Sequence, residues 1–371
     1  MLIVINISKW RNNVNNNNLT KFGFNPRFEA EANMYENLYV GRVTSQAKHL
    51  YRIMTSQGEL LGEVSGKYRY ETKDLADFPA AGDYVMIDRL DDNQGHAIIH
   101  HTLTRQSAMV RSAAGTAHES QVVAANMDYI FITVALNNDF NVRRLERYLS
   151  SAWNSGATPV IVLTKTDLSQ TLTEQLMDVE DVALGVDIIL SSPDDDSGIK
   201  QIHQLLMPNK TGVFVGSSGV GKSTLINRLL GESVLTTQGL RNDDRGRHTT
   251  TYRQLFTLPG GGVVIDTPGM RQLSVENTDI SKGFADIDEL ATQCKFNDCS
   301  HTNEPQCAVQ AAIQNGSLSQ ERYDSYLKLK KESAYEGLSS REIEHVKLDE
   351  MFKEVGGMKG ARKQLKHKAR K

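Results

Sequence analysis

Residues 216–224, GSSGVGKST, restrict what this chain can fold into more than any other stretch. They fit the pattern G-x-x-x-x-G-K-[ST] and join the apolar run GVFVGS (212–217) to the helix-like segment STLINRLLG (223–231). A glycine-rich loop between a buried strand and a helix directs its backbone N–H groups toward a phosphate. The sequence therefore predicts a phosphate-binding loop in an α/β domain, and the flanking strand and helix disfavour a chance match in a glycine-rich turn.

The positions of this loop have different expected tasks. Gly216, Gly219 and Gly221 allow the backbone to curl around the phosphates. Lys222 is expected to reach the β- and γ-phosphates and to act in catalysis, and the Ser223 hydroxyl is expected to bind Mg²⁺. The other nucleotide contacts expected in the loop are Ser217, Ser218, Val220 and Thr224.

Further strands of the same domain are predicted by apolar runs of the kind that form buried parallel strands. Helical patterns such as NVRRLERYLSSAW (141–153) separate several of these runs, and this alternation indicates a parallel sheet. We expect the domain to occupy residues 109–280. Its predicted strands are 129–136, 159–164, 186–191, 212–217 and 262–267.

The region before this domain has a different pattern. Residues 11–18 read RNNVNNNN, and we expect residues 1–36 to be a flexible Asn-rich extension. Over residues 37–108, short apolar segments alternate with turn residues, which predicts a Greek-key barrel of the oligonucleotide/oligosaccharide-binding (OB) type, although other small barrels share the pattern. The five strand-length segments are 38–45, 50–56, 60–66, 83–90 and 96–103.

The ends of two predicted strands indicate which nucleotide binds. TKTD (164–167) follows one strand, and the Asp167 carboxylate can accept hydrogen bonds from N1–H and N2–H₂ of guanine, which adenine does not offer. The Lys165 stem is expected to cover one face of the base, and LSS (190–192) to place a backbone N–H near guanine O6. Expected nucleotide contacts at these strand ends are Thr164, Lys165, Thr166, Asp167, Ser191 and Ser192.

DTPGM (266–270) closes the last predicted strand and supplies further contacts. Asp266 is expected to hold Mg²⁺ through water, and the Gly269 N–H to sense the γ-phosphate. Many GTP hydrolases carry a glutamine after this glycine, but Met270 stands here and cannot orient water.

The segment HTTT (248–251) offers residues for that task. Thr250 is the expected contact of Mg²⁺ and the γ-phosphate, with Thr249 and Thr251 as alternatives. His248 is a candidate for positioning the attacking water, and a surface histidine on a mobile loop is the alternative.

All three cysteines lie close together, with the spacing C-x₄-C-x-H-x₅-C. Three thiolates and one imidazole complete a tetrahedral Zn²⁺ shell, and a full set of protein ligands makes such a site structural. Unconnected thiols beside a chance histidine are the alternative. We expect one zinc ion in a mostly helical module over residues 281–371, held by Cys294, Cys299, His301 and Cys307.

The guanine motif precedes the phosphate loop, whereas most GTP-binding domains have the reverse order. TKTD, LSS, GSSGVGKST, GRHTTT and DTPG in this order resemble the ribosome small-subunit-dependent GTPase A family, bacterial assembly factors with a circularly permuted GTPase domain. The resemblance includes FGFNP (22–26), QVVAANMDYIFI (121–132) and the cysteine cluster, which is a zinc module in the family, so it covers nearly the whole chain. Thr164 departs from the family, whose guanine motif usually has Asn, and this puts base affinity in question.

The resemblance implies a GTP hydrolase that binds the 30S ribosomal subunit and its 16S rRNA near the decoding region, acts late in subunit maturation, and is stimulated by that subunit. The alternative is an RNA-binding assembly factor whose affinity the nucleotide tunes and whose hydrolysis is incidental, while TKTD disfavours an ATPase or kinase. Because GRHTTT and DTPG come just before the cysteine module, we expect loss of the γ-phosphate to release them and move that module.

The charge distribution is compatible with an RNA partner. Residues 359–371 hold seven Lys/Arg and no acidic residue, and the rest of the chain has 35 Lys/Arg against 45 Asp/Glu; a solvated, disordered end is the alternative. The barrel region is not basic overall, and its aromatics Tyr51, Tyr68 and Tyr70 are candidate stacking platforms or core residues. No apolar run reaches the length of a signal or a membrane span, so we expect a cytoplasmic monomer without membrane contact.

Overall fold

The computed structural model describes residues 17–47, 49–91, 93, 95–112, 120–235, 253–267, 283–302 and 304–334. The chain divides into two compact units. The first comprises Met1–Lys73, Asp77–Met109 and Val122–Gln272, and the second comprises Asp74–Ala76, Val110–Gln121 and Leu273–Lys371. The barrel and the α/β domain fall in one unit, and the domain boundaries given above stay predictions.

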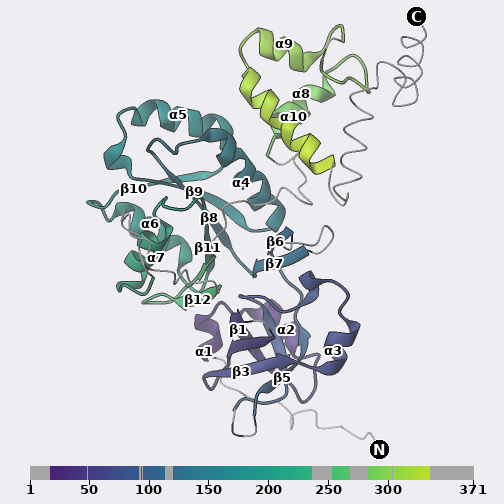
Figure 1. The fold of residues 1–371 in the computed structure, drawn as a ribbon, viewed down its shortest axis with the longest axis vertical. Helices are drawn as coiled ribbons and strands as arrows, with labels where there is room; N and C mark the ends of the chain where they lie inside the picture. The colour runs from purple at the N-terminus through teal and green to yellow at the C-terminus, as the bar shows by residue number, and fades with distance from the viewer. Residues whose placement is uncertain are drawn as a thin grey trace, which may run out of the picture. The chain divides into compact units, whose positions relative to one another are not determined.

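The N-terminal part of the first unit is the predicted five-stranded barrel (Figure 1). Its strands are β1 (Tyr39–Ala47), β2 (Leu50–Met54), β3 (Glu59–Val64), β4 (Tyr84–Ile87) and β5 (Ala97–Thr102), with α3 (Gly66–Glu71) and the 3₁₀ turn Leu75–Asp77 between β3 and β4. The strand order is β1-β2-β3-β5-β4, and β4 pairs back with β1, which closes the barrel. Only β3 and β5 are parallel, and apolar side chains such as Val43, Ile53 and Ile87 fill the interior.

Residues 17–36 differ from the flexible extension that the sequence predicted. They contain α1 (Asn17–Lys21) and α2 (Pro26–Ala32), and Asn25 caps α2 by accepting hydrogen bonds from two backbone N–H groups. The side chains of Leu19, Phe24 and Phe28 are buried in a cluster with barrel residues. Burial of these apolar groups against the barrel orders the segment despite the polar run before it. Residues 1–16 lie outside the described part of the chain.

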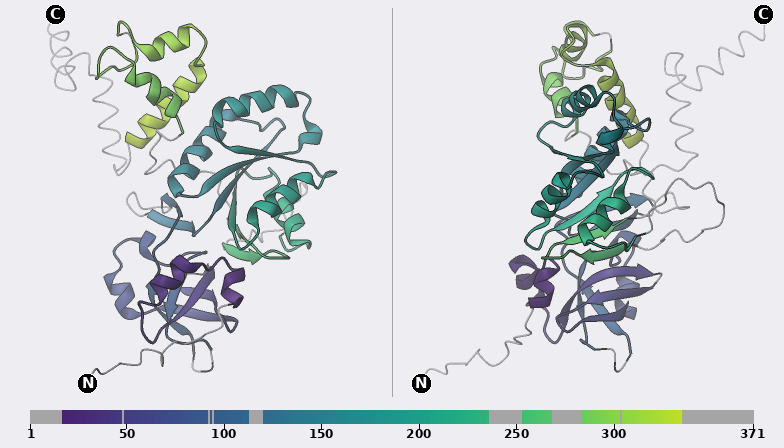
Figure 2. Two further views of the ribbon diagram at one scale, coloured as in Figure 1. Left: turned by 180° about the vertical axis from the view of Figure 1, so that it is seen from behind. Right: turned by 90° about the vertical axis from the view of Figure 1, so that its left-hand side faces the viewer.

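The rest of the first unit is the predicted α/β domain (Figures 1 and 2). Its parallel strands lie in the order β10-β9-β8-β11-β13, and the core between sheet and helices includes Phe131, Val162, Phe214 and Ile226. The strands are β8 (Tyr129–Ala135), β9 (Thr158–Thr164), β10 (Asp187–Ser191), β11 (Thr211–Val215) and β13 (Val263–Asp266). The helices are α4 (Val142–Ser155), α5 (Leu172–Val182), α6 (Ser197–Leu206) and α7 (Lys222–Leu230), with the 3₁₀ turn Thr166–Leu168 after β9.

Three further strands were not predicted. β6 (Ala108–Ser112) and β7 (Ser120–Ala125) pair with each other. β12 (Gln254–Thr257) is antiparallel to β13 and pairs with β1 of the barrel through Gln254 and Ser45, so one sheet continues from the α/β domain into the barrel.

Arg42 of β1 also joins the barrel to the α/β domain. Its side chain is fully buried and donates hydrogen bonds to the carbonyl oxygens of Gly82 (3.1 Å) and Asn126 (3.3 Å). The guanidinium carbon lies 4.9 Å from the ring centre of Tyr84. At Gly82, where φ is +97°, a Cβ atom would lie 2.1 Å from the Ala125 carbonyl oxygen, so the two backbones approach too closely for any other residue.

The described part of the second unit is mainly helical, as predicted, with α8 (Ala285–Thr292), α9 (Ala308–Gln314) and α10 (Gln320–Ala334). Its own small core includes Phe284, Ile287, Val309 and Tyr323. Across the described residues, no helix has the length and apolar character needed to span a membrane.

Candidate functional site

The predicted nucleotide-binding motifs meet at one edge of the parallel sheet. TKTD begins at the last residue of β9, LSS lies at the end of β10, GSSGVGKST follows β11, and DTPG begins at the last residue of β13. These strands are parallel, so their carboxyl ends lie on the same side of the sheet. Ligands of open α/β sheets bind at this edge.

The phosphate loop has the backbone shape that its glycines predict. φ is +144° at Gly216, +77° at Gly219 and +104° at Gly221, and Gly221 is the N-cap of α7. A Cβ atom on Gly216 would lie 2.3 Å from the carbonyl oxygen of Thr133, whereas one on Gly219 would meet nothing within 4 Å. Gly216 is therefore required both for its backbone angle and for close packing against β8.

Lys222, the first residue of α7, folds back over this loop. Its Nζ donates hydrogen bonds to the carbonyl oxygens of Gly216 (2.7 Å) and Ser217 (2.6 Å). Burial lowers the pKa of Lys222 to about 8, and the nearby Asp266 opposes this shift. Burial also raises the pKa of Asp266, and the charge of Lys222 offsets part of this rise. Bound phosphates would favour the charged ammonium by the same electrostatic rule.

Two of the predicted Mg²⁺ ligands flank the same loop. Ser223 is the second residue of α7, and Asp266 ends β13, the strand next to β11. The Thr267 hydroxyl donates to the carbonyl oxygen of Phe214 (3.0 Å) and so fixes the end of β13 beside β11. A hydroxyl and a carboxylate are oxygen ligands of the kind that Mg²⁺ takes together with substrate phosphates, so these residues fit that ion. His248, Thr250 and Gly269 lie outside the described residues.

Thr164 connects the guanine motif to the phosphate loop. Its side chain is 5% exposed, and its hydroxyl lies 2.6 Å from the carbonyl oxygen of Val220 and 3.3 Å from that of Val134 in β8. The sequence suggested Thr164 only as a nucleotide contact. Its position shows a supporting role, in which the hydroxyl holds the end of β9 against the phosphate loop.

The other residues predicted to contact guanine lie at the carboxyl ends of β9 and β10. Lys165 has a φ of +57°, which turns the chain sharply at the end of β9, and Asp167 is exposed in the following 3₁₀ turn. Ser191 is buried and pairs with Thr164 in the register of β9 and β10. The Thr166 hydroxyl lies 3.5 Å from the Ser191 carbonyl oxygen, so TKTD and LSS are in contact.

Arg228 is a site residue that the sequence did not reveal. It lies on α7, and its guanidinium donates to the carbonyl oxygens of Ser192 (2.7 Å) and Asp195 (2.9 Å) and to Oδ1 of Asp196 (2.6 Å). All three acceptors lie in the loop after β10. An arginine in the polar part of a helix gives no local signal of such a contact, because its partners are distant in the sequence.

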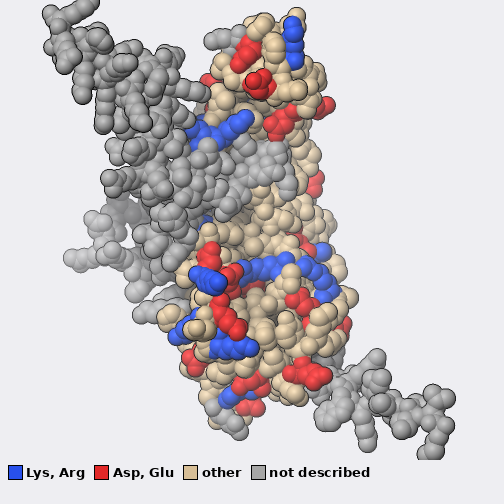
Figure 3. All heavy atoms as spheres, turned by 90° about the vertical axis from the view of Figure 1, so that its right-hand side faces the viewer, with Lys and Arg blue, Asp and Glu red and all other residues tan. Residues whose placement is uncertain are grey.

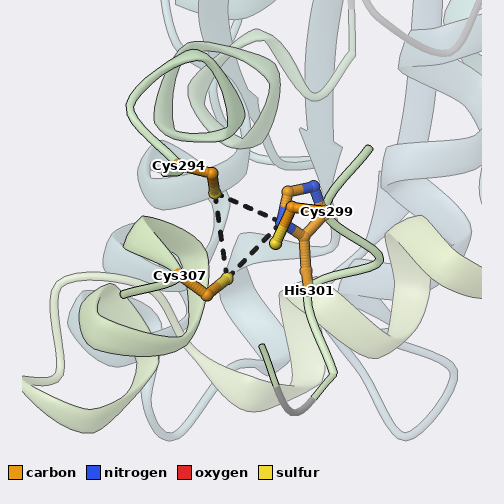
Figure 4. Close-up of side chains that lie close together, drawn as sticks. All are labelled: Cys294, Cys299, His301 and Cys307. Atoms are coloured by element: carbon orange, nitrogen blue, oxygen red, sulfur yellow. Dashed lines mark hydrogen bonds between the residues drawn. The ribbon is translucent and has the colours of Figure 1, made fainter. Parts of the chain in front are cut away.

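The predicted zinc ligands converge in the second unit (Figure 4). Their ligand atoms all lie within 4.8 Å of one another. The Sγ atoms of Cys294 and Cys307 are 3.8 Å apart, and each is 3.5 Å from Nδ1 of His301. Tetrahedral Zn²⁺, with Zn–S bonds of about 2.3 Å and Zn–N bonds of about 2.0 Å, separates two sulfurs by about 3.8 Å and a sulfur from a nitrogen by about 3.5 Å. The Cys₃His group, with Cys299 as the fourth member, therefore fits a structural zinc ion.

Neighbouring side chains hold these ligands in place. The His301 backbone carbonyl accepts hydrogen bonds from Nε2 of Gln310 (2.6 Å) and from the Tyr323 hydroxyl (3.0 Å). Burial lowers the pKa of His301, which keeps the imidazole neutral, as a metal ligand must be. Sγ of Cys307 accepts a hydrogen bond from the Gln310 N–H at the start of α9. The cluster therefore connects the loop of 294–307 to two helices.

The barrel surface carries both signs of charge. On the face drawn in Figure 3, Lys and Arg are interleaved with Asp and Glu over this part of the molecule, and Arg52 and Glu59 form an exposed ion pair. Of the candidate stacking residues, Tyr51 is 2% exposed and belongs to the core, and the Tyr68 hydroxyl is hydrogen-bonded to the Asp77 carbonyl oxygen. Only Tyr70, with 90% exposure, is free to stack on a base.

Comparison with known proteins identifies relatives over most of the chain. A family model described as RsgA GTPase matches residues 102–276. The small ribosomal subunit biogenesis GTPase RsgA 2 of Lactiplantibacillus plantarum is 48% identical over 95% of this chain and 98% of that protein. The small ribosomal subunit biogenesis GTPase RsgA 1 of Oceanobacillus iheyensis is 43% identical over 80% of this chain and 85% of that protein.

Solved structures agree with this result. The crystal structure of YjeQ from Thermotoga maritima aligns with a TM-score of 0.58 and 26% identity, over 79% of this chain and 97% of that one. The fold also matches that of YloQ, a circularly permuted GTPase, with a TM-score of 0.56, 24% identity and coverage of 79% of this chain and 94% of that one. The fold of this chain is thus shared with known structures, one of which is described as a circularly permuted GTPase.

Proposed function

Because this chain belongs to the RsgA GTPase family, we propose that it binds the 30S ribosomal subunit with GTP and leaves after hydrolysis, late in subunit maturation. It is a GTP hydrolase that acts in small-subunit biogenesis. The likeness to the RsgA relatives supports the part of the proposal that concerns the subunit, and the 2.6 Å contact between the Thr164 hydroxyl and the Val220 carbonyl oxygen carries the part that concerns the nucleotide. This contact holds the end of β9, where TKTD begins, beside the phosphate loop, and it supports the binding of one guanine nucleotide by both motifs.

The described residues support the following division of tasks. The backbone N–H groups of residues 216–221 and the Lys222 ammonium hold the phosphates, while the Asp167 carboxylate accepts hydrogen bonds from guanine. Ser223 and Asp266 would hold Mg²⁺, which neutralises charge on the phosphates when bound. His248, Thr250 and Gly269 remain the proposed residues for positioning water and for sensing the γ-phosphate.

We assign the Cys₃His cluster to one structural zinc ion, held by Cys294, Cys299, His301 and Cys307. Its fit to tetrahedral distances supports this assignment, and a complete set of protein ligands leaves no open position for chemistry. The ion would hold together the small helical module, whose apolar core is small. The module would then be a rigid body that the nucleotide state can move.

The proposed partner is the 30S subunit with its 16S rRNA, met by a cytoplasmic monomer. The barrel region is not basic overall, and the face drawn in Figure 3 has mixed charges, so RNA contact would depend on local groups and on the basic residues 359–371. Switch segments joined to the zinc module would pass the nucleotide state to the subunit. Hydrogen exchange over residues 277–310 is then expected to differ between the GTP and GDP complexes, and identical protection would refute this coupling.

Phosphate release from GTP, measured with and without purified small subunits and with ATP as the control, tests the function. Strong stimulation by the small subunit, seen with GTP and absent with ATP, is the expected result. Slow hydrolysis that small subunits leave unchanged would instead favour the RNA-binding factor with incidental turnover. Equal rates with GTP and ATP would contradict the assignment of Asp167 to guanine.

A further inference from the structure

The contacts of Arg228 lie outside the phosphate loop. It lies on α7, the helix that begins at Lys222, but its guanidinium reaches the loop after β10. There it donates from Nη1 to the Ser192 carbonyl oxygen and from Nη2 to the Asp195 carbonyl oxygen, at 2.7 and 2.9 Å. One planar guanidinium thus fixes two backbone carbonyls of one short loop, which a fork of N–H donors is suited to do.

Local contacts shape the rest of the loop that Arg228 holds, and the Thr166 hydroxyl contacts its first residue, Ser191. Ser192 and Asp195 form an isolated β-bridge, and Oδ1 of Asp195 accepts a hydrogen bond from the Ser197 N–H at the start of α6 (2.8 Å). Gly198 lies so close to β10 that a Cβ atom would be 2.2 Å from the Leu190 carbonyl oxygen. These contacts shape the loop and hold it at the end of β10. The hydrogen bonds of Arg228 connect this loop to α7, the helix that follows the phosphate loop.

The ion pair of Arg228 with Asp196 contributes less than the carbonyl contacts. The Asp196 side chain is 70% exposed, and an ion pair with an exposed carboxylate is weakened by solvent. The Arg228 side chain is only 22% exposed. Its hydrogen bond to the Ser192 carbonyl oxygen is partly buried, and it is therefore better shielded from water than the exposed ion pair with Asp196.

We propose that Arg228 is a positioning residue for guanine specificity, which holds the loop of residues 191–196 so that a backbone N–H points at O6 of the base. This inference rests on the proposed guanine site. It assigns to Arg228 the task of aligning the loop that contacts O6 of the base. Arg228 does not touch the nucleotide. It acts through the loop, and because α7 starts in the phosphate loop, it sets the distance between the phosphate-binding and O6-reading parts of the site.

The experiment compares nucleotides that differ at one edge of the base. 6-Thio-GTP keeps N1–H and the 2-amino group but replaces O6 by sulfur, a weak acceptor, while ITP keeps O6 and lacks the 2-amino group. Affinities for GTP, 6-thio-GTP, ITP and ATP are measured on the full chain and on Arg228→Gln. Asp196→Asn is the matched control, because it removes the ion pair and keeps both carbonyl contacts. Thermal melting establishes that each variant is folded.

We expect Arg228→Gln to lose about fivefold or more of the preference for GTP over 6-thio-GTP, which corresponds to one hydrogen bond. The preference for GTP over ITP should stay within about twofold of wild type, since Asp167 reads the 2-amino group. Asp196→Asn should match wild type in both ratios. Arg228→Lys should be intermediate, because an ammonium cannot span two carbonyls as a guanidinium does.

A uniform loss of affinity for all four nucleotides in Arg228→Gln, with unchanged ratios, would overturn the inference and leave Arg228 a merely structural residue. An unchanged 6-thio-GTP ratio at full affinity would overturn it as well. Failure of the proposed function gives a different result. In that case the wild-type protein itself shows no preference for GTP over ATP.

Discussion

Replacement of Thr164 by valine tests how much of the nucleotide site depends on a single hydroxyl. Valine keeps the branched shape of the side chain and removes only the O–H that lies 2.6 Å from the Val220 carbonyl oxygen. Thr164 is 5% exposed and Val220 2% exposed, so water cannot replace the lost donor. Removing one partner of a buried hydrogen bond costs about 1–3 kcal/mol. We therefore expect the free energy of unfolding of the nucleotide-free protein to fall by about that amount.

The same change should weaken GTP binding. Without the hydroxyl, the phosphate loop and the end of β9 are no longer held together in the nucleotide-free protein. Part of the binding free energy of GTP is then used to order these two segments. A cost of about 1 kcal/mol in preorganisation lowers the affinity for GTP about fivefold. Denaturant unfolding gives the first quantity, and titration with a fluorescent guanine nucleotide gives the second.

Thr164→Ser is the matched control, because it keeps the hydroxyl and removes only a methyl group. That variant should retain most of the stability and most of the affinity. If Thr164→Val unfolds at the wild-type midpoint and binds GTP with wild-type affinity, the hydroxyl contributes nothing, and the contact is incidental to the site.

Three further predictions concern the loop lysine, the loop glycines and the zinc cluster. Because burial lowers the pKa of Lys222 to about 8 and phosphates favour its charged form, GTP affinity should fall as pH rises above about 8 in a binding titration, and Lys222→Arg should show no such fall. The pKa of Lys222 in the folded protein lies below its ordinary value of 10.5, so the charged lysine destabilises the nucleotide-free protein at low pH. The free energy of unfolding of the nucleotide-free protein should therefore rise as pH rises from about 8 toward 10.5, which denaturant unfolding measures. Gly216→Ala should abolish GTP binding in the same titration, because its Cβ would lie 2.3 Å from a carbonyl oxygen, whereas Gly219→Ala adds only the backbone strain of a positive φ, about 1–2 kcal/mol. Elemental analysis should find one zinc ion per chain, and its removal by a chelator should raise hydrogen exchange across 283–334 while GTP binding persists; unchanged exchange after removal would contradict a structural role.

The sequence predicted most of the sheet, because strands buried on both faces are continuous apolar runs. Each predicted strand of the barrel and of the α/β domain is present. β12 was missed because four residues are too few to show a period, and its place is set by pairing with β13 and β1. The two N-terminal helices were missed because they are short and follow an Asn-rich run, so their order depends on three apolar side chains meeting the barrel.

For the site, the motifs predicted which residues meet but not what supports them. The phosphate loop, the guanine motif and the cysteine cluster each have a fixed spacing that the chemistry of the ligand demands. Thr164 was identified as a departure from the usual Asn, but its contact with Val220 was not, because the two residues are 56 positions apart in the sequence. Arg228 belongs to no motif, since two of its three partners are backbone carbonyl oxygens, which every residue provides.

These two supports explain how guanine and phosphate recognition can be held in one geometry. β8 lies between β9 and β11, so the guanine motif and the phosphate loop are not on adjacent strands. The Thr164 hydroxyl crosses that gap, with the carbonyl oxygens of Val134 in β8 and Val220 in the loop as its neighbours. Arg228 reaches the end of β10 from α7. Both contacts therefore join the base-reading segments to the phosphate loop or to the helix that follows it. Circular permutation changes where the chain begins and ends, but side-chain contacts of this kind do not depend on chain order. We therefore expect guanine recognition in this protein to depend on an intact α7, because loosening the last turn of that helix would release the contact of Arg228 with the loop after β10.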